Sequence, residues 1–271
     1  MKVTRLSAVT RRFYTSVLTE LGQGGIEFLV GGGHALESYL GIGRSVKDLD
    51  LFIRERDVSA ALALVEQRLG YGTELTFPHW LAKIKRDERE HIDVIFNSGN
   101  AVCPVDDECF QHAVPTTVMG LPVRLYPAEE MIWSKAFVME RERYDGADIC
   151  HLILACHHRL DWPRLLARFG SHWRVLLSHL TLFGFIYPGE RHHVPAAVML
   201  ELLRRLDAET RVPSPRLRVC RGTLLSREQY LVDVSGWGYA DGRLGPSGTM
   251  TPEEVTQWTA AIRDPGDREC E

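Results

Sequence analysis

Two aspartates form the pattern in this 271-residue chain that most clearly suggests chemistry. Asp48 and Asp50 alternate with leucines at the start of the apolar segment 49–53. Residues two apart on a strand point to the same face, so this strand would present two carboxylates side by side. An exposed edge strand with two solvated acids is the alternative, but the apolar neighbours indicate burial, and buried paired carboxylates repel each other unless a cation compensates. The pair therefore predicts a site for Mg²⁺ (or Mn²⁺), which binds carboxylates together with substrate phosphates.

Three consecutive glycines precede the aspartates. Gly31, Gly32 and Gly33 follow the apolar segment 26–30, where a strand would turn into a helix. Backbone N–H groups at a helix N-terminus bind phosphate well. A glycine triplet can also simply allow a helix to pack closely on a strand, but its position upstream of Asp48 and Asp50 favours a phosphate cradle. Which two of the three glycines form the cradle stays open, and alignment on Leu29-Val30 favours Gly31 and Gly32. Glycines and carboxylates together predict chemistry on a nucleoside triphosphate.

The segment from Val30 to Leu51 resembles the signature of the DNA polymerase β-type nucleotidyltransferase superfamily, a Gly-Gly turn followed by a strand carrying Asp-x-Asp. In detail it is similar to small bacterial nucleotidyltransferases that include toxins of type IV toxin–antitoxin systems. Val46 stands where relatives often have threonine, which removes a local hydroxyl contact and leaves the carboxylates intact. The resemblance covers roughly residues 25 to 160, and the rest of the chain is interpreted from its own pattern.

Asp93 is a single acid in the apolar segment 91–96. It could be a satisfied polar residue at a strand end. The resemblance instead implies a third carboxylate that completes the metal cluster and helps to activate the attacking hydroxyl or to bind a second metal. Arg44 and Lys47 flank the metal strand, where either could touch the triphosphate or be a solvated loop charge. Arg44 matches a recurrent basic position of the family.

A second group of charges follows in the segment 129–149. The resemblance places Lys135 on the β- and γ-phosphates and Asp148 at the edge of the site. The acids also have a structural interpretation, since Asp145 at an N-cap and Asp148 three residues later would start the next helix. Both interpretations stay open at this stage.

The periodicity of apolar residues predicts an α/β (α+β) fold. Strands alternate with helices and a hairpin follows, which indicates a mixed sheet of the nucleotidyltransferase type followed by a helical domain. Helices are predicted at 7–21, 34–40, 58–69, 128–143, 147–159, 162–168, 171–183 and 195–206, and strands at 26–30, 49–53, 80–85 and 91–96.

The same pattern divides the chain into three parts. Residues 1–125 would form the nucleotidyltransferase core domain, 126–210 the helical domain, and 211–271 a C-terminal extension that is docked but frayed at its end. The Val212-Pro-Ser-Pro215 stretch marks the last junction. We expect Trp237, Gly238 and Tyr239 to dock near the cleft between the first two parts.

Composition limits the possible partners. A net charge of −4 gives no global attraction to nucleic acid or to an anionic membrane, so an RNA-binding surface would have to come from the arginine-rich back half. No apolar run approaches the roughly 20 residues of a membrane span, and no signal peptide is evident, so a cytoplasmic location is expected. The six cysteines lack a Cys-x-x-Cys pair and are expected to be reduced, and the histidine spacing matches no zinc pattern.

The sequence therefore predicts a metal-dependent nucleotidyltransferase that moves a nucleoside monophosphate from a nucleoside triphosphate to an acceptor hydroxyl and releases pyrophosphate. The resemblance allows the 3′ end of a tRNA or other RNA, a protein hydroxyl, or a small molecule such as an aminoglycoside as acceptor, and an antitoxin as partner. Two alternatives remain: a catalytically degenerate nucleotide- or RNA-binding module, and a phosphotransferase that moves the γ-phosphate.

Overall fold

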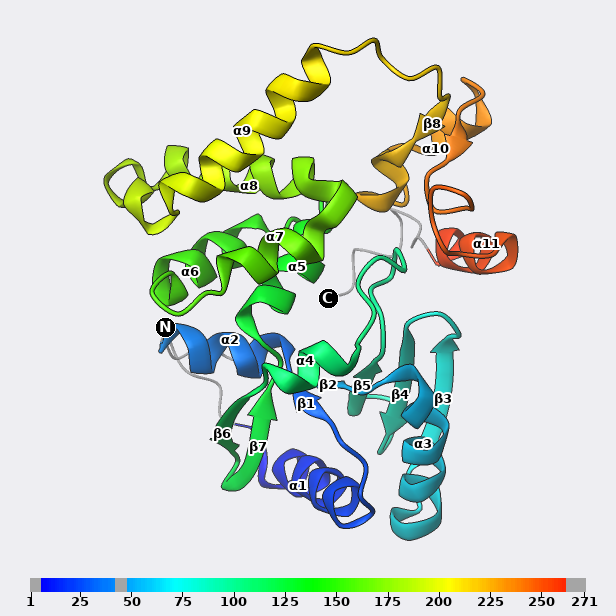
Figure 1. Cartoon of the computed structure of the whole chain (residues 1–271). Helices are drawn as coiled ribbons and strands as arrows, with labels where there is room; N and C mark the ends of the chain where they lie inside the picture. Colours follow the sequence, from blue (N-terminus) through cyan, green and yellow to red (C-terminus); the bar gives the residue numbers. More distant parts are fainter. Residues whose placement is uncertain (1–5, 42–47, 262–271) are drawn as a thin grey trace.

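A seven-stranded mixed sheet forms the centre of the protein, which we describe from a computed structural model over residues 6–41 and 48–261 (Figure 1). The strand order is β3-β4-β5-β2-β1-β7-β6. β2 pairs in parallel with β5, and β1 in parallel with β7, while the other neighbours are antiparallel. The strands are β1 Leu29–Val30, β2 Leu49–Phe52, β3 Gly72–Phe77, β4 Leu81–Lys85, β5 His91–Ile95, β6 Val114–Val118 and β7 Leu121–Leu125.

Two amphipathic helices pack against each other beside the sheet (Figure 1). In α1, Ala8–Gln23, the Ser7 side chain caps the first turn by accepting a hydrogen bond from the Thr10 N–H at 2.9 Å. In α3, Glu55–Leu69, the buried residues recur every three or four positions, as a one-sided helix requires. The third helix of this part, α2 Gly32–Leu40, leaves β1 directly and contacts β2.

A layer of helices follows the sheet, above it in the view of Figure 1. The helix α5 lies at its centre and contacts α6, α7 and α8. The short helix α4, Asp107–Gln111, connects β5 to β6. The layer consists of α5 Ala128–Ala136, α6 Gly146–Cys156, α7 Trp162–Phe169, α8 Trp173–Ile186 and α9 Ala196–Thr210, with 3₁₀ turns η1 Gly170–His172 and η2 Pro188–His193 on either side of α8.

Buried ion pairs join this layer to α4. Glu130 on α5 is fully buried, and its carboxylate accepts hydrogen bonds from Arg164 and, at 3.1 Å, from Arg168. Arg168 also reaches Asp106, the N-cap of α4, at 2.6 Å. Burial raises the pKa of Glu130 in spite of the opposing pull of Arg164 and Arg168, so keeping this charge ionised is costly. The charges of Arg164 and Arg168 offset the free-energy cost of burying the ionised Glu130 carboxylate.

The C-terminal segment returns to the sheet (Figure 1). On α11, Pro252–Ala260, the Trp258 ring meets Phe77 edge to face at 5.0 Å and Trp80 at 5.2 Å, and Arg227 lies over its face at 4.2 Å. Trp237, by contrast, is 62% exposed. Trp237 is therefore not the docking residue that we expected near the cleft. The C-terminal segment docks instead through Trp258, whose ring finds apolar partners where β3 turns into β4.

The same segment also contacts the turn after α5 and the loop after β5. The Leu225 carbonyl accepts a hydrogen bond from the Met139 N–H at 3.0 Å, and the Leu224 carbonyl accepts one from the Asn100 amide at 2.7 Å. Short elements complete it: β8 Val219–Cys220, η3 Arg221–Leu224, α10 Leu231–Ser235 and β9 Ala240–Asp241. The division of the chain into three domains stays a prediction.

The predicted fold class is confirmed: a mixed sheet is followed by a helical region. One helix prediction is wrong in length, since α5 ends at Ala136 instead of continuing to 143. The chain turns there, and Met139 pairs with Tyr144 in an isolated antiparallel bridge. Three strands, β3, β6 and β7, were not predicted. β3 and β6 are largely exposed and lack apolar alternation, so the sequence gives them no period-2 signal.

Within residues 6–41 and 48–261, no helix is long and apolar enough to cross a bilayer. The five cysteines in this part of the chain are free thiols, four of them buried.

Replacing Glu130 with alanine should destabilise the protein by about 3 kcal/mol or more, because Arg164 and Arg168 lose a buried partner. Urea unfolding measures this. Glu201→Ala is the matched control, since Glu201 pairs with Arg204 and Arg205 on the exposed side of α9 and should change little. Equal midpoints for the two variants would contradict the assigned role of Glu130.

Candidate active site

A row of charged side chains crosses the middle of the sheet. Asp50 on β2 is the register partner of Asp93 on β5, and Asp93 is the register partner of Lys83 on β4. Residues that are partners in register project to the same face, and the flanking Leu49 and Leu51 are buried on the other. The strands thus bring two carboxylates and one ammonium together from three separate segments of the chain.

Gly32 lies directly against the first of these carboxylates. Its φ of +52° is in the left-handed region, and a Cβ at this position would overlap the Asp50 Oδ2. The Gly31 N–H donates to the Asp50 carbonyl oxygen at 3.0 Å and fixes the turn from β1 into α2. The N-terminus of α2 is thereby held beside the Asp50 carboxylate.

The surroundings of Asp50 disfavour the ionised form of its carboxyl group. Burial raises its pKa to about 6, with further increases from the neighbouring charges of Asp93 and Asp48, while Lys135 and Arg143 pull in the opposite direction. Asp48 itself is exposed, at the entrance to β2. Two like charges held close together in a half-buried site favour either a bound proton or a bound cation.

One carboxylate oxygen of Asp93 is buried without a hydrogen-bond donor. This oxygen is Oδ1, and the Lys83 Nζ and the His91 Nε2 each lie 3.5 Å away from it. A buried carboxylate oxygen without a donor fits a divalent cation. Over the described residues, the oxygens of Asp48, Asp50 and Asp93 do not all lie within 4.8 Å of one another, so the three acids do not converge on a single point. Mg²⁺ is held by one or two carboxylates and keeps waters and substrate phosphates among its ligands, so it does not require three converging carboxylates.

Lys135 lies in a second charged cluster on the helical side. Its Nζ contacts Asp145 at 2.7 Å and Asp148 at 2.9 Å, and Arg143 donates to Asp145 at 3.0 Å. Burial raises the pKa of Asp145, but Arg143 and Lys135 outweigh it and hold the pKa below its ordinary value. Asp145 occupies the N-cap position of α6 without capping it, so its side chain serves the cluster and not the helix start.

The predicted site residues thus fall into three sets. The structure gathers Asp48, Asp50, Asp93, Gly31 and Gly32 at one place on the sheet. Lys135 and Asp148 form the cluster on α5 and α6, and Lys135 is close enough to act on Asp50. Arg44 and Lys47 lie outside the described residues, so their predicted contacts stay predictions.

Sequence reasoning missed three charged residues. Lys83 alternates with buried Ala82 and Ile84, a signal that could have placed it on the face of Asp93. Asp145 was interpreted only as a helix cap. Arg143 carried no usable signal, because the predicted helix 128–143 continued through the turn that directs it toward Asp145.

The structure thus holds paired acids on adjacent strands of a mixed sheet, with a glycine turn packed against one of them. Residues 10–162, more than half of the chain, match the family model described as "Nucleotidyl transferase of unknown function (DUF2204)", and the chain belongs to this family. No curated protein matches the chain.

Several solved structures are similar to the chain at low identity. They include the antibiotic-resistance factor ANT(2'')-Ia in solution (22% identity, 64% of this chain, 98% of that chain, TM-score 0.43). A second is the lincosamide antibiotic adenylyltransferase LnuA with lincomycin bound (14% identity, 55% of this chain, 98% of that chain, TM-score 0.38). A third is JHP933 from Helicobacter pylori (12% identity, 76% of this chain, 97% of that chain, TM-score 0.37). At these identities and TM-scores, the likeness transfers no substrate to this chain.

Gly32→Ala should disturb the site more than an ordinary substitution of a left-handed glycine. A methyl group at Gly32 must displace the Asp50 carboxylate, whereas Gly70, with φ +70°, has open space around it. Both variants should lose about 1 kcal/mol from backbone strain, and only Gly32→Ala should also lose Mg²⁺-dependent nucleotide binding in calorimetry. Equal nucleotide affinity in the two variants would refute the role of Gly32.

Asp50→Asn should change how the stability of the metal-free protein depends on pH. The Asp50 pKa is about 6 in the folded state, above its ordinary value of 3.8, so the favourable contribution of this carboxyl is complete below pH 4 and is lost as the pH rises through 6. The variant should therefore gain up to about 3 kcal/mol on the wild type between pH 4 and pH 8. Urea unfolding at several pH values measures this, and saturating Mg²⁺ should reduce the gain. A difference that does not vary with pH would contradict the prediction.

Proposed function

We propose that the protein is a Mg²⁺- or Mn²⁺-dependent enzyme that transfers a nucleoside monophosphate from a nucleoside triphosphate to an acceptor hydroxyl. The observation that carries this proposal is the register pairing of Asp50 and Asp93 on parallel strands, with Gly32 packed against the Asp50 carboxylate. Membership in a nucleotidyl transferase family supports the same reaction class.

Each part of the site has a proposed role. Asp48, Asp50 and Asp93 would hold the metal, and the N-terminus of α2 at Gly31 and Gly32 would bind phosphate oxygens through its N–H groups. When bound, the metal neutralises charge on the phosphates and on the leaving group. Arg44 is proposed, from the sequence alone, as a further phosphate contact.

The chemical step needs one proton acceptor. The acceptor oxygen forms a bond to the α-phosphorus, the bond from that phosphorus to the oxygen bridging to the β-phosphate breaks, and pyrophosphate leaves with that oxygen. We assign the hydroxyl proton to the Asp93 carboxylate. Lys83, 3.5 Å from Asp93, would keep the carboxylate oriented.

Lys135 is proposed to bind the β- and γ-phosphates. In the described structure its charge is shared between Asp145 and Asp148, so a triphosphate would join or replace those partners. Because Asp145 is also held by Arg143, it can keep a cationic partner when Lys135 turns to the phosphates. Catalysis then comes mainly from positioning and charge neutralisation.

For the acceptor, we favour a small-molecule or protein hydroxyl over RNA. Three arginines of the arginine-rich back half are neutralised locally: Arg204 and Arg205 pair with Glu201 on α9, and Arg211, at the C-cap of that helix, pairs with Asp207. Phosphate backbones bind to uncompensated Lys and Arg charge, and these pairs reduce it. Nothing in the described structure supports an antitoxin partner in particular.

Nucleotidyl transfer can be tested with nucleoside triphosphates labelled at the α-phosphate. The protein with Mg²⁺ is offered each labelled nucleotide and three acceptor pools: small-molecule aminoglycosides, lysate protein and total tRNA. We expect label in one pool and equimolar pyrophosphate. Asp48→Asn/Asp50→Asn should reduce the rate by about 10³-fold or more, because charge neutralisation is lost. Asp207→Asn, which removes an exposed carboxylate on α9, is the matched control.

Other products would point elsewhere. Nucleoside diphosphate in place of pyrophosphate would indicate γ-phosphoryl transfer. Nucleotide binding without turnover, in calorimetry with all four nucleotides and every acceptor pool, would instead support the degenerate binding module. Full activity in the double aspartate variant would refute the site itself.

A further inference from the structure

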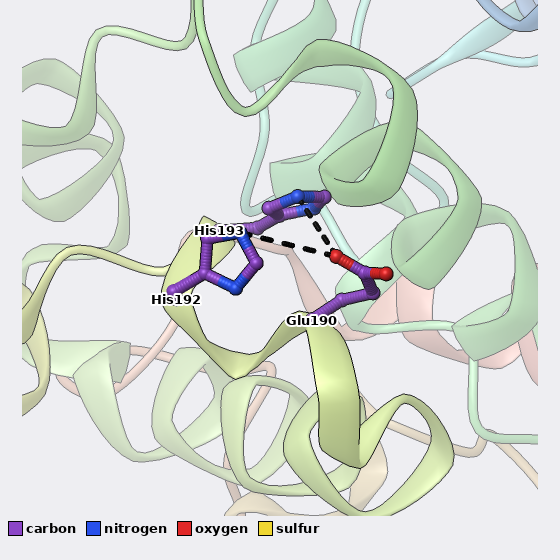
Figure 2. Close-up of side chains that lie close together, drawn as sticks. All are labelled: Glu190, His192 and His193. Atoms are coloured by element: carbon purple, nitrogen blue, oxygen red, sulfur yellow. Dashed lines mark ion pairs between the residues drawn. The ribbon is translucent and has the colours of Figure 1, made fainter.

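A second group of metal-ligand side chains lies on the 3₁₀ turn η2, between α8 and α9. Glu190, His192 and His193 place their ligand atoms within 4.8 Å of one another, and no other trio in residues 6–41 and 48–261 does so. Figure 2 shows both imidazoles directed at one carboxylate oxygen of Glu190. The histidine pair alone predicted no zinc site; Glu190 becomes its partner because residues three apart are stacked along a 3₁₀ turn.

The distances fit coordination. The His193 Nε2 lies 3.2 Å from the Glu190 Oε2, and the His192 Nε2 lies 3.9 Å from it. Two ligands on a tetrahedral Zn²⁺ are separated by about 3.3 Å, given metal–ligand bonds of about 2.0–2.1 Å. His193 therefore already stands at ligand spacing. His192 needs only a small rotation, and its side chain is 72% exposed and free to make it.

The surroundings hold one ligand in place. The His193 side chain is only 12% exposed, and its ring lies flat against that of His157, with centroids 3.5 Å apart and planes 8° apart. The His193 Nδ1 is buried without a hydrogen-bond partner, so stacking and not a hydrogen bond orients the ring.

We propose that Glu190, His192 and His193 bind a transition-metal ion of the Zn²⁺ class, with water completing the coordination. Two imidazoles and one carboxylate suit zinc, whereas magnesium prefers oxygen ligands throughout, so this site is chemically distinct from the aspartates on the sheet. The ion would fix the turn between α8 and α9. Through the stacked His157 at the end of α6, it would also brace that helix.

Cobalt(II) gives a direct readout of such a site. The full-length protein is stripped with a chelator and titrated with Co²⁺ in excess Mg²⁺, which occupies the aspartates. We expect one equivalent of Co²⁺ to produce visible d–d absorption without thiolate charge transfer, and Zn²⁺ to abolish it. His192→Ala should weaken Co²⁺ binding at least about tenfold. His112→Ala is the matched control, since it removes an exposed histidine at the end of α4, outside the proposed site.

Thermal melting separates loss of the site from loss of the fold. Zn²⁺ should raise the Tm of the wild type and of His112→Ala but not that of His192→Ala, while the three metal-free proteins should melt together because His192 is exposed. The proposal is overturned if His192→Ala binds Co²⁺ as the wild type does, or if the bound Co²⁺ shows thiolate charge transfer, which would assign it to cysteines.

Discussion

The buried Glu130 carboxylate is the constraint on which the relation between the sheet and the helices depends. A fully buried charge must be compensated, and here Arg164 and Arg168 reach it from α7 while Arg168 also holds Asp106 at the start of α4. These pairs leave α5 little freedom of position. Lys135 lies on the same helix, so the network also sets where its ammonium stands relative to the acids of the sheet.

A second constraint acts inside the sheet. The parallel register of β2 and β5 makes Asp50 and Asp93 neighbours, and burial, together with the repulsion between these two acids, raises the pKa of Asp50. Hydrophobic packing beneath the strands prevents the two acids from separating. Such a pair costs stability in the absence of a cation, and a cost of this kind is common at sites that bind one. The contact of Gly32 with Asp50 follows from the same tight packing, since only a residue without a Cβ fits there.

Much of the fold was predictable from the sequence. The predicted helices at 7–21, 34–40 and 58–69 correspond to α1, α2 and α3, because their apolar residues recur with helical spacing and glycines mark their ends. The exposed strands β3 and β6 were not predictable, since pairing with a neighbour and not an apolar period makes them strands. The end of α5 at Ala136 was likewise not predictable, since the chain turns there into a bridge between Met139 and Tyr144 that has no local sequence pattern.

The sequence by itself determined which groups stand near the centre of the sheet: Gly31 and Gly32, the Asp48–Asp50 pair and Asp93 lie within or beside short apolar segments whose strand character could be predicted locally. Tertiary structure decided their partners. Lys83 faces Asp93 only through strand register, and Asp145 meets Lys135 only because the chain turns after α5. The stacking of His157 on His193 also joins distant segments. Local sequence fixes which groups a segment can offer, whereas the packing of segments far apart in the chain fixes which charges meet, because long-range contacts carry no periodic signal.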